Sequence, residues 1–209
     1  MENTNPSTYA RGRGPNLARL AATWAWILMV GYPCVSLAQA EFHMMPIRRL
    51  APSRFGQLPT SIIRALEARG CTVPQTWAYD DSASMDVVRK PHNVVRGSFL
   101  KNGQKDWAVL CSCRDSSSIL VFWGGRAEHP AELARSRDDG CTQDVDGRGS
   151  LGYSRFLGVA NPKRILSHNP GLKLNQGPLH DAIEDAFMEK GSVLYYFQGD
   201  GWKELDGAD

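Results

Sequence analysis

Three β-rich runs that lie close together in the chain decide the fold: VVRGSFL at 94–100, DWAVLCSC at 106–113 and SILVFW at 118–123. Asn102-Gly103 separates the first two runs and is a strong hairpin signal, with a connection longer than a two-residue turn. The third run is apolar on both faces, which is typical of a central strand covered on both sides. The sequence therefore predicts a three-stranded antiparallel meander.

Helical periodicity occurs on either side of these strands. The segment 61–69 has an apolar face and stops at Gly70, and the segment 179–190 has an amphipathic stripe and stops at Gly191. We expect both segments to be helices. The stripe of the second consists of Leu179, Ile183, Ala186 and Phe187.

Weaker signals complete the domain. Together the segments predict one α+β domain over 58–209, an antiparallel sheet with two packed helices, after an irregular arm at 41–57. The weaker elements are a short helix at 130–136, strands at 153–159 and 164–167, and a closing hairpin of 193–198 with 202–205.

Residues 1–40 have the organisation of a signal peptide. Three arginines precede the nearly pure apolar run 20–30, and Ala38-Gln39-Ala40 has the small-x-small pattern of a cleavage site. The run is shorter than the ~20 residues of a membrane span. We expect cleavage after Ala40, no permanent membrane span and export to the periplasm or the medium. An uncleaved N-terminal anchor is the alternative.

The charge balance disfavours nucleic acid as a partner. The 209 residues contain 24 Lys+Arg and 22 Asp+Glu, of which three Arg and Glu2 lie in the first forty. The mature chain therefore has 21 residues of each sign. A nucleic-acid-binding protein normally carries a basic surplus.

Four cysteines follow the signal segment: Cys71, Cys111, Cys113 and Cys141. An even number in an exported chain predicts two disulfides. Cys111 and Cys113 are two residues apart on a predicted strand. Such residues are separated by about 6.5 Å, which is too far for a disulfide between them. We expect Cys71 to bond one of this pair and Cys141 the other, and the order stays open. A metal site or a nucleophilic thiol is the alternative, although no Cys-x-x-Cys occurs.

Short runs resemble known sequences. Gly97-Ser-Phe99 with Gly103-Gln-Lys-Asp106 is similar to a single blade segment of FG-GAP-type propeller repeats, which occur in several copies. Other runs resemble short exported bacterial proteins of unassigned function, which implies export and a shared fold over most of 58–209 but no activity. These runs are 70–75, 91–95, 106–112, 118–123 and 181–190.

Two constellations suggest a metal. On the predicted second helix, His180 and Glu184 stand one turn apart and would share a face. Asp144 and Asp146 occupy positions 3 and 5 of an EF-hand-like calcium loop within the acidic segment 138–146. The alternatives are acidic residues that complement a helix dipole and a polar turn. We expect no cofactor, with calcium as the alternative.

Serines and aromatic residues give the remaining candidates. The run 116–118 with His92, His129 or His168 lacks the Gly-x-Ser-x-Gly elbow of an acyl-transfer site, and we expect a turn there. Trp202 and Tyr196 in the closing hairpin are candidates for a binding surface.

The sequence thus predicts an exported, disulfide-stapled binding domain without catalytic activity, whose partner lies in the envelope or outside the cell. The alternative is a small secreted hydrolase or metal-dependent enzyme that uses His180 and Glu184 or the acidic loop 138–146.

Overall fold

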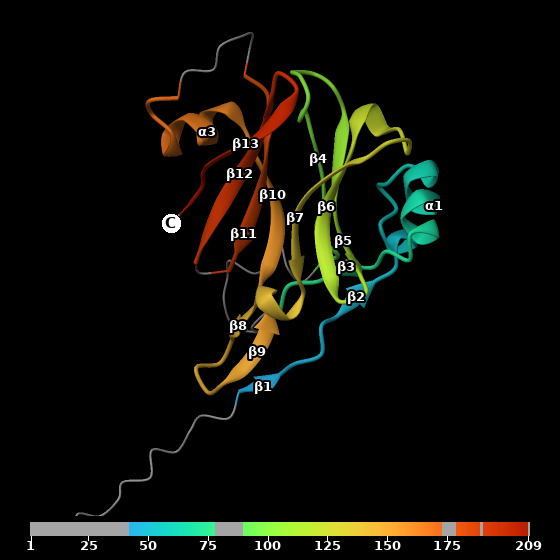
Figure 1. The fold of residues 1–209 in the computed structure, drawn as a ribbon, viewed down its shortest axis with the longest axis vertical. Coiled ribbons are helices and arrows are strands. Elements are labelled where there is room, and N and C mark those ends of the chain that lie inside the picture. Colours follow the sequence, from blue (N-terminus) through green and yellow to red (C-terminus); the bar gives the residue numbers. More distant parts are fainter. Residues whose placement is uncertain (1–41, 78–89, 173–178, 189, 209) are drawn as a thin grey trace, which may run out of the picture. The chain divides into compact units, whose positions relative to one another are not determined.

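The three runs form consecutive strands of a four-stranded antiparallel sheet (Figure 1). The computed structural model describes residues 42–77, 90–172, 179–188 and 190–208, which all belong to one compact unit. The predicted three antiparallel strands are confirmed, and a fourth continues the sheet. The strands are β4 (Val94–Gly97), β5 (Asp106–Cys113), β6 (Ser116–Phe122) and β7 (Ala131–Arg137).

A second four-stranded antiparallel sheet is formed by the C-terminal part of the chain. Its strands are also neighbours in chain order, and its last two strands confirm the predicted closing hairpin, which turns at Gly199 with a positive φ of 69°. The strands are β10 (Arg155–Ala160), β11 (Ala182–Phe187), β12 (Gly191–Gln198) and β13 (Gly201–Asp206).

Two small sheets connect the large ones. Strand β9 (Ser150–Tyr153) pairs in parallel with β1 (His43–Met44) and antiparallel with β8 (Thr142–Asp144). Strand β2 (Arg49–Leu50) pairs with β3 (Val73–Pro74). The arm at 41–57, predicted to be irregular, thus contributes two short strands.

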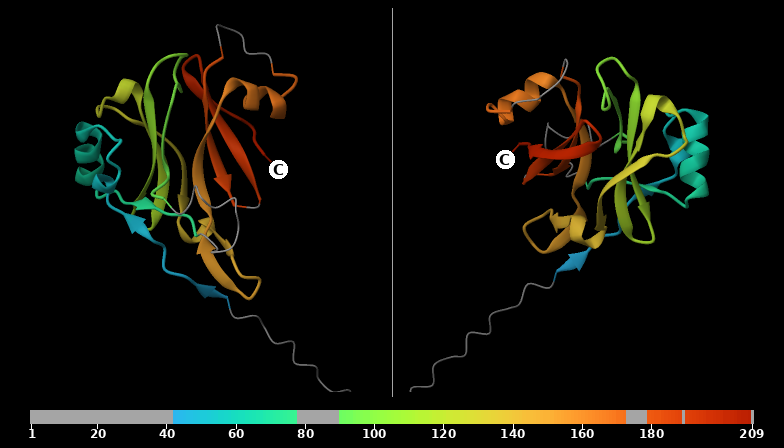
Figure 2. Two further views of the ribbon diagram at one scale, coloured as in Figure 1. Left: turned by 180° about the vertical axis from the view of Figure 1, so that it is seen from behind. Right: turned by 45° about the horizontal axis from the view of Figure 1, so that its top comes forward.

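Two α-helices occur in the described residues, α1 (Thr60–Ala68) and α3 (Pro162–His168). Helix α1 confirms the predicted first helix, and it covers the outer face of the first sheet, while α3 lies beside the second sheet (Figures 1 and 2). Three short 3-10 turns also occur where the structure describes the chain: Pro52–Arg54, Trp123–Gly125 and Asp139–Cys141.

Three apolar clusters hold these layers together. The first packs Ile62 and Leu66 of α1 against β5 and β6, and the second lies between the two sheets. The third packs Ile165 of α3 against the outer face of the second sheet. Both large sheets are therefore covered on both faces, which explains the continuous apolar run of β6.

The predicted second helix at 179–190 is wrong, because this segment contains β11. Ile183 and Phe187 pack in the cluster between the sheets, whereas Ala182 packs in the cluster under α3. These residues follow the two-residue alternation of a strand, and the acidic residues among them are buried with arginine partners, as described below.

Two weaker predictions are also wrong. The segment 130–136 is not a helix, because it forms most of β7 with an alternating pattern of burial. The segment 164–167 is not a strand, because it lies in α3. Asn161 caps this helix by accepting a hydrogen bond from the Arg164 N–H, and Pro162 takes the first position.

The expected signal peptide at 1–40 lies outside the described residues. Within the described part of the chain, no helix has the length and apolar character needed to cross a membrane.

Candidate functional site

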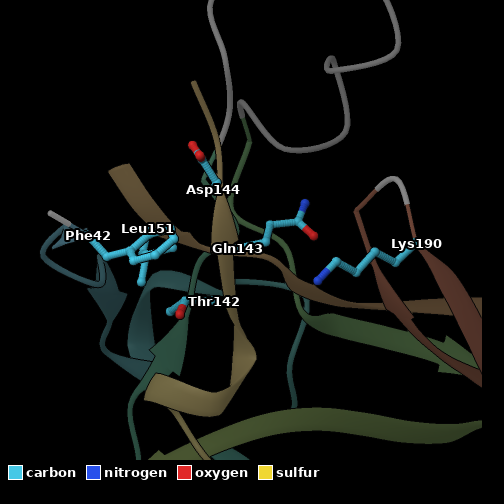
Figure 3. A pocket seen from close by; sticks show the side chains of 6 residues that line it. All are labelled: Phe42, Thr142, Gln143, Asp144, Leu151 and Lys190. Carbon is cyan, nitrogen blue, oxygen red and sulfur yellow. The ribbon is translucent and has the colours of Figure 1, made fainter. Parts of the chain in front are cut away.

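An open pocket of about 420 Å³ lies beside strand β8 (Figure 3). Its walls come from β8 itself, from β9, from the residue before β1 and from the turn between β11 and β12. The lining side chains are Phe42, Thr142, Gln143, Asp144, Leu151 and Lys190.

The pocket wraps around the outer edge of β8. Asp144 pairs with Leu151, and Gln143 pairs with Gly152. Because side chains alternate along a strand, Leu151 and Gln143 lie on opposite faces of this hairpin. Among the described strands, β9 alone pairs with β8, so the other edge of β8 faces the pocket without a strand partner.

The backbone of that edge has a defined polarity. The Ser154 N–H donates to the Cys141 carbonyl at 2.9 Å, and the Val145 N–H donates to the Ser150 carbonyl at 2.9 Å. The odd-numbered residues of the strand therefore face β9, and alternation turns the N–H and C=O groups of Thr142 and Asp144 towards the open edge.

Gln143 has an unused acceptor at the pocket. Its Nε2 donates to the Met188 carbonyl at 2.7 Å, which fixes the orientation of the side chain. Its Oε1 is buried and has no hydrogen-bond partner among the described residues. A buried acceptor without a donor costs about 1–3 kcal/mol.

Charged and apolar groups flank this amide. The side chain of Lys190 reaches towards Gln143 on one side of β8, and Phe42 and Leu151 lie on the other side (Figure 3). Phe42 is 67% exposed, and among the described residues Lys190 has no ion-pair partner. The pocket thus offers an ammonium donor and an exposed aromatic ring.

The two aspartates of the predicted calcium loop stabilise the turn between β8 and β9. Asp144 accepts from the N–H groups of Asp146 and Gly149, at 3.1 and 3.0 Å. Asp146 accepts from the Arg148 N–H at 2.8 Å and from the Ser150 hydroxyl at 2.6 Å. The Ser150 and Arg148 hydrogen bonds lower the pKa of Asp146 to about 2. These bonds are those of a polar turn.

The other acidic residues of the 138–146 segment have partners elsewhere. Asp138 is 1% exposed, and its Oδ2 accepts from Arg49 at 2.8 Å and from Ser112 at 2.5 Å. Asp139 is exposed and pairs with Arg137, whose hydrogen bond lowers the pKa of Asp139. The segment therefore does not converge on one centre.

His180 and Glu184 are not brought together either. In an extended chain, residues four apart are separated by about 13 Å, instead of one helical turn. His180 lies within 2.9 Å of the carbonyl oxygens of Asp181 and Phe197, whereas Glu184 accepts two hydrogen bonds from Arg164 and one from Ser192. The helix that was expected to put these two side chains on one face is not formed, because Ala182–Phe187 is a strand.

The two aromatic candidates differ in burial. Tyr196 is 4% exposed and stacks on His180 with a centroid separation of 4.2 Å, so it is a core residue and not a surface for binding. Burial raises its pKa. Trp202 is half-buried and stacks on Trp123 at 5.6 Å, with Phe197 at its edge.

Sequence reasoning missed a buried polar network between the sheets. Arg155 of β10 binds Asp185 of β11 through two hydrogen bonds and also donates to Ser117, Ser136 and the Ala134 carbonyl. Burial lowers the pKa of Arg155 and the Asp185 carboxylate raises it, with a net rise. One signal of this network was present in the sequence. In the predicted strand 153–159, alternation puts Arg155 on the same face as the apolar Leu157, which indicates a buried arginine.

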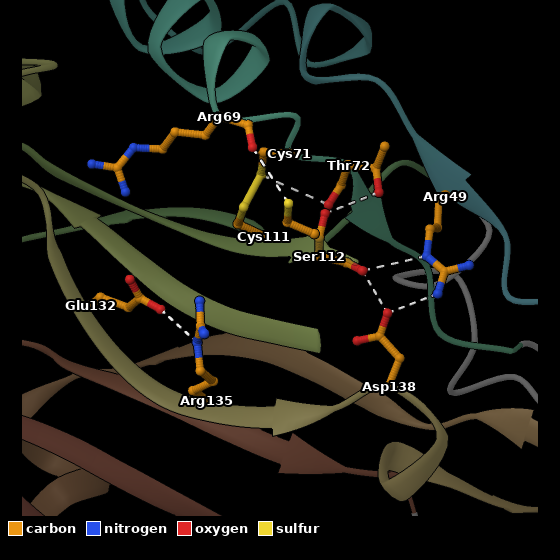
Figure 4. The surroundings of a disulfide bond; sticks show 10 residues. Arg49, Arg69, Cys71, Thr72, Cys111, Ser112, Glu132, Arg135 and Asp138 are labelled. Atoms are coloured by element: carbon orange, nitrogen blue, oxygen red, sulfur yellow. Dashed lines mark hydrogen bonds and ion pairs between the residues drawn. A yellow bond between two sulfur atoms is a disulfide. The ribbon is translucent and has the colours of Figure 1, made fainter. Parts of the chain in front are cut away.

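The four cysteines of the described residues form one disulfide. Cys71 is bonded to Cys111 with a Cα–Cα distance of 5.4 Å (Figure 4). The predicted second bond is wrong, because Cys113 and Cys141 are free. Cys113 lies on the face of β5 that carries Cys111 and is covered by α1, whereas Cys141 is buried in the cluster between the sheets.

Ser117 and His92, two of the acyl-transfer candidates, have partners elsewhere. Ser117 binds Tyr153 at 3.2 Å and Arg155 inside the network, and burial raises the pKa of Tyr153. The Nε2 of His92 accepts from the Thr76 N–H at 2.8 Å, and burial lowers the pKa of His92.

In the part of the chain that the structure describes, no three His, Cys, Asp or Glu side chains are grouped to hold a metal ion. No family model matches this chain, and neither a curated protein nor a solved structure is similar enough to match it.

Proposed function

We propose that the protein is an exported binding domain that holds an extended peptide against the open edge of β8. The observation that carries the proposal is that the open edge of β8 lies at the pocket. The residues whose N–H and C=O groups point outward from this edge, Thr142 and Asp144, also line the pocket. An added strand satisfies such groups with backbone hydrogen bonds, and the pockets beside it select alternate side chains.

The two faces of the pocket call for two kinds of side chain on the peptide. Phe42 and Leu151 offer an apolar surface on one face, so a leucine or a similar residue fits there. On the other face, an Asn or Gln carboxamide would accept a hydrogen bond from the Lys190 ammonium through its oxygen. Neighbouring residues of a strand point to opposite faces, so the motif is an apolar residue next to an amide.

Export is part of the proposal. It is supported by the charged, apolar and small-residue pattern of residues 1–40 and by the Cys71–Cys111 disulfide, which is typical of an oxidising compartment. Cleavage after Ala40 would leave Phe42 in the mature chain, so the pocket keeps its aromatic wall.

The test is calorimetric titration of residues 41–209 with an acetylated and amidated Thr-Leu-Gln-Leu-Thr peptide. A second peptide of the same sequence carries N-methyl groups on alternate backbone nitrogens that face β8. We expect the methylated peptide to bind at least about tenfold more weakly, since tenfold corresponds to about 1.4 kcal/mol. Equal binding of both peptides, or binding of neither, contradicts the proposal.

A pair of lysine variants tests the position. Lys190→Gln removes the ammonium at the pocket and should weaken binding about threefold to tenfold. Lys203→Gln changes an exposed lysine of β13 and should leave binding unchanged. Equal effects of the two variants would place binding elsewhere.

A further inference from the structure

Cys113 lies at the same corner of the fold as the Cys71–Cys111 disulfide. The Thr72 N–H donates to the Ser112 carbonyl at 2.9 Å, and the Ser112 N–H donates to the Thr72 carbonyl at 2.7 Å. If this isolated antiparallel bridge is extended by one residue in each strand, Cys113 comes opposite Cys71. The bonded partner, Cys111, is its diagonal neighbour.

Side-chain contacts place the Cys113 sulfur beside the chain that leads into Cys71. The Cys113 thiol donates to the Arg69 carbonyl at 3.5 Å. Its Sγ is 3.9 Å from the position that a Cβ on Gly70 would take. Gly70 directly precedes Cys71 in the chain. The free thiol of Cys113 therefore lies beside the residue next to a disulfide-bonded cysteine.

We propose that Cys113 is an exchange thiol, and that Cys71 alternates between Cys111 and Cys113 as its disulfide partner. The Cys113 thiolate attacks the Sγ of Cys71, and a new bond forms between these sulfurs. The Cys71–Cys111 bond breaks, and its electron pair leaves with Cys111, which takes up a proton from water. The step conserves the number of disulfides, so no oxidant or reductant is consumed.

The two possible partners of Cys71 differ in burial. Cys111 is part of the cluster beneath α1, and Cys113 lies at the less buried end of β5. Exchange therefore moves the cross-link two residues along β5, from Cys111 to Cys113, and converts the buried Cys111 to a free thiol. Cys141 does not take part, because it lies in the cluster on the other face of the sheet.

Two serine variants of residues 41–209 test the proposal after refolding in a glutathione redox buffer, with acid quenching and peptide mapping. Cys111→Ser should form a bond between Cys71 and Cys113, and the matched Cys113→Ser should keep the bond between Cys71 and Cys111. If Cys113→Ser forms its bond while Cys71 and Cys113 stay unlinked in Cys111→Ser, the proposal is overturned.

A time course on the unmodified sequence avoids any dependence on the folding of the variants. The chain is held at about pH 8.5, where thiolates are abundant, labelled with a maleimide at intervals and mapped. We expect the label on Cys111 and the Cys71–Cys113 peptide pair to increase together with time. A label that stays on Cys113, with no Cys71–Cys113 pair at any time, contradicts exchange.

Discussion

Arg155 and Asp185 form a two-point ion pair between neighbouring strands of the second sheet, with Nε–Oδ1 and Nη2–Oδ2 distances both of 2.8 Å. Both side chains are almost fully buried. The same guanidinium donates to the Ala134 carbonyl of β7, at a residue with a positive φ of 53°. The ion pair therefore connects the two large sheets across the core between them.

Removing one partner of this ion pair should destabilise the protein strongly. Asp185→Ala leaves the guanidinium buried without its carboxylate, and we expect a loss of about 3–5 kcal/mol in the free energy of unfolding. Urea unfolding at neutral pH measures the loss. Glu132→Gln, which breaks an exposed pair with Arg135, is the control and should change the free energy by about 0.5 kcal/mol or less. Similar losses in both variants would contradict the structural role of Arg155.

The burial of His92 predicts that stability falls in mild acid. Burial lowers the pKa of His92 from its ordinary value of 6.5, and the positive charge of Arg48 lowers it further, against the opposing hydrogen bond to the Lys90 carbonyl. The unfolded chain therefore binds a proton first, and this contribution to stability is present above pH 6.5 and is lost as the pH falls towards the lowered pKa.

The measurement is the urea midpoint between about pH 5 and pH 8 for the wild type, His92→Gln and His43→Gln. Glutamine keeps an acceptor without titrating, so His92→Gln should reduce the fall in midpoint below pH 6.5. His43 is exposed, and its variant should retain the wild-type profile. A wild-type profile in His92→Gln would contradict the assignment.

Asp106 is expected to stabilise the loops at one end of the first sheet. It is fully buried, and its carboxylate accepts from the N–H groups of Phe99, Leu100 and Gly124, between 2.7 and 3.0 Å. Asp106→Ala removes all these acceptors, and we expect a loss of about 3 kcal/mol or more in urea unfolding. Asp106→Asn keeps one acceptor oxygen and should lose less. The account would be wrong if the alanine variant were as stable as the wild type.

The two free thiols should differ in reactivity. In residues 41–209 of the folded protein, a short pulse of thiol reagent should label Cys113, which is half-buried, before Cys141, which is 1% exposed. Unfolding in urea without reductant should then make Cys141 equally reactive. Equal labelling rates in the folded protein would show that Cys141 is not enclosed as described.

The first sheet could be predicted because its information is local. The runs that form β5 and β6 are apolar on both faces and are joined by turn residues, and no distant partner is needed to recognise them. Helix α3 also had a local signal in Asn161-Pro162, an N-cap followed by proline, which the weak β pattern of 164–167 obscured.

The error at 179–190 has a different cause. The spacing of Ile183, Ala186 and Phe187 fits the apolar face of a helix. The acidic residues between them are of the kind expected on the solvent-exposed face of such a helix. In the protein, Glu184 and Asp185 are buried. They pair with Arg164 and Arg155, which lie 20 and 30 residues away in the chain. Such pairing is not visible in a local window. For the same reason the sequence did not predict the pocket, whose walls join only when β1, β8 and β9 pair.

The most direct test of the proposed binding site is an amide chemical-shift titration of ¹⁵N-labelled residues 41–209 with the acetylated Thr-Leu-Gln-Leu-Thr peptide. We predict that the largest shifts occur at the backbone N–H groups of Thr142 and Asp144 and at the side-chain amide of Gln143. The outer edge of β13 should remain unperturbed. Shifts centred on β13, or no shifts at millimolar peptide, would contradict binding at the edge of β8.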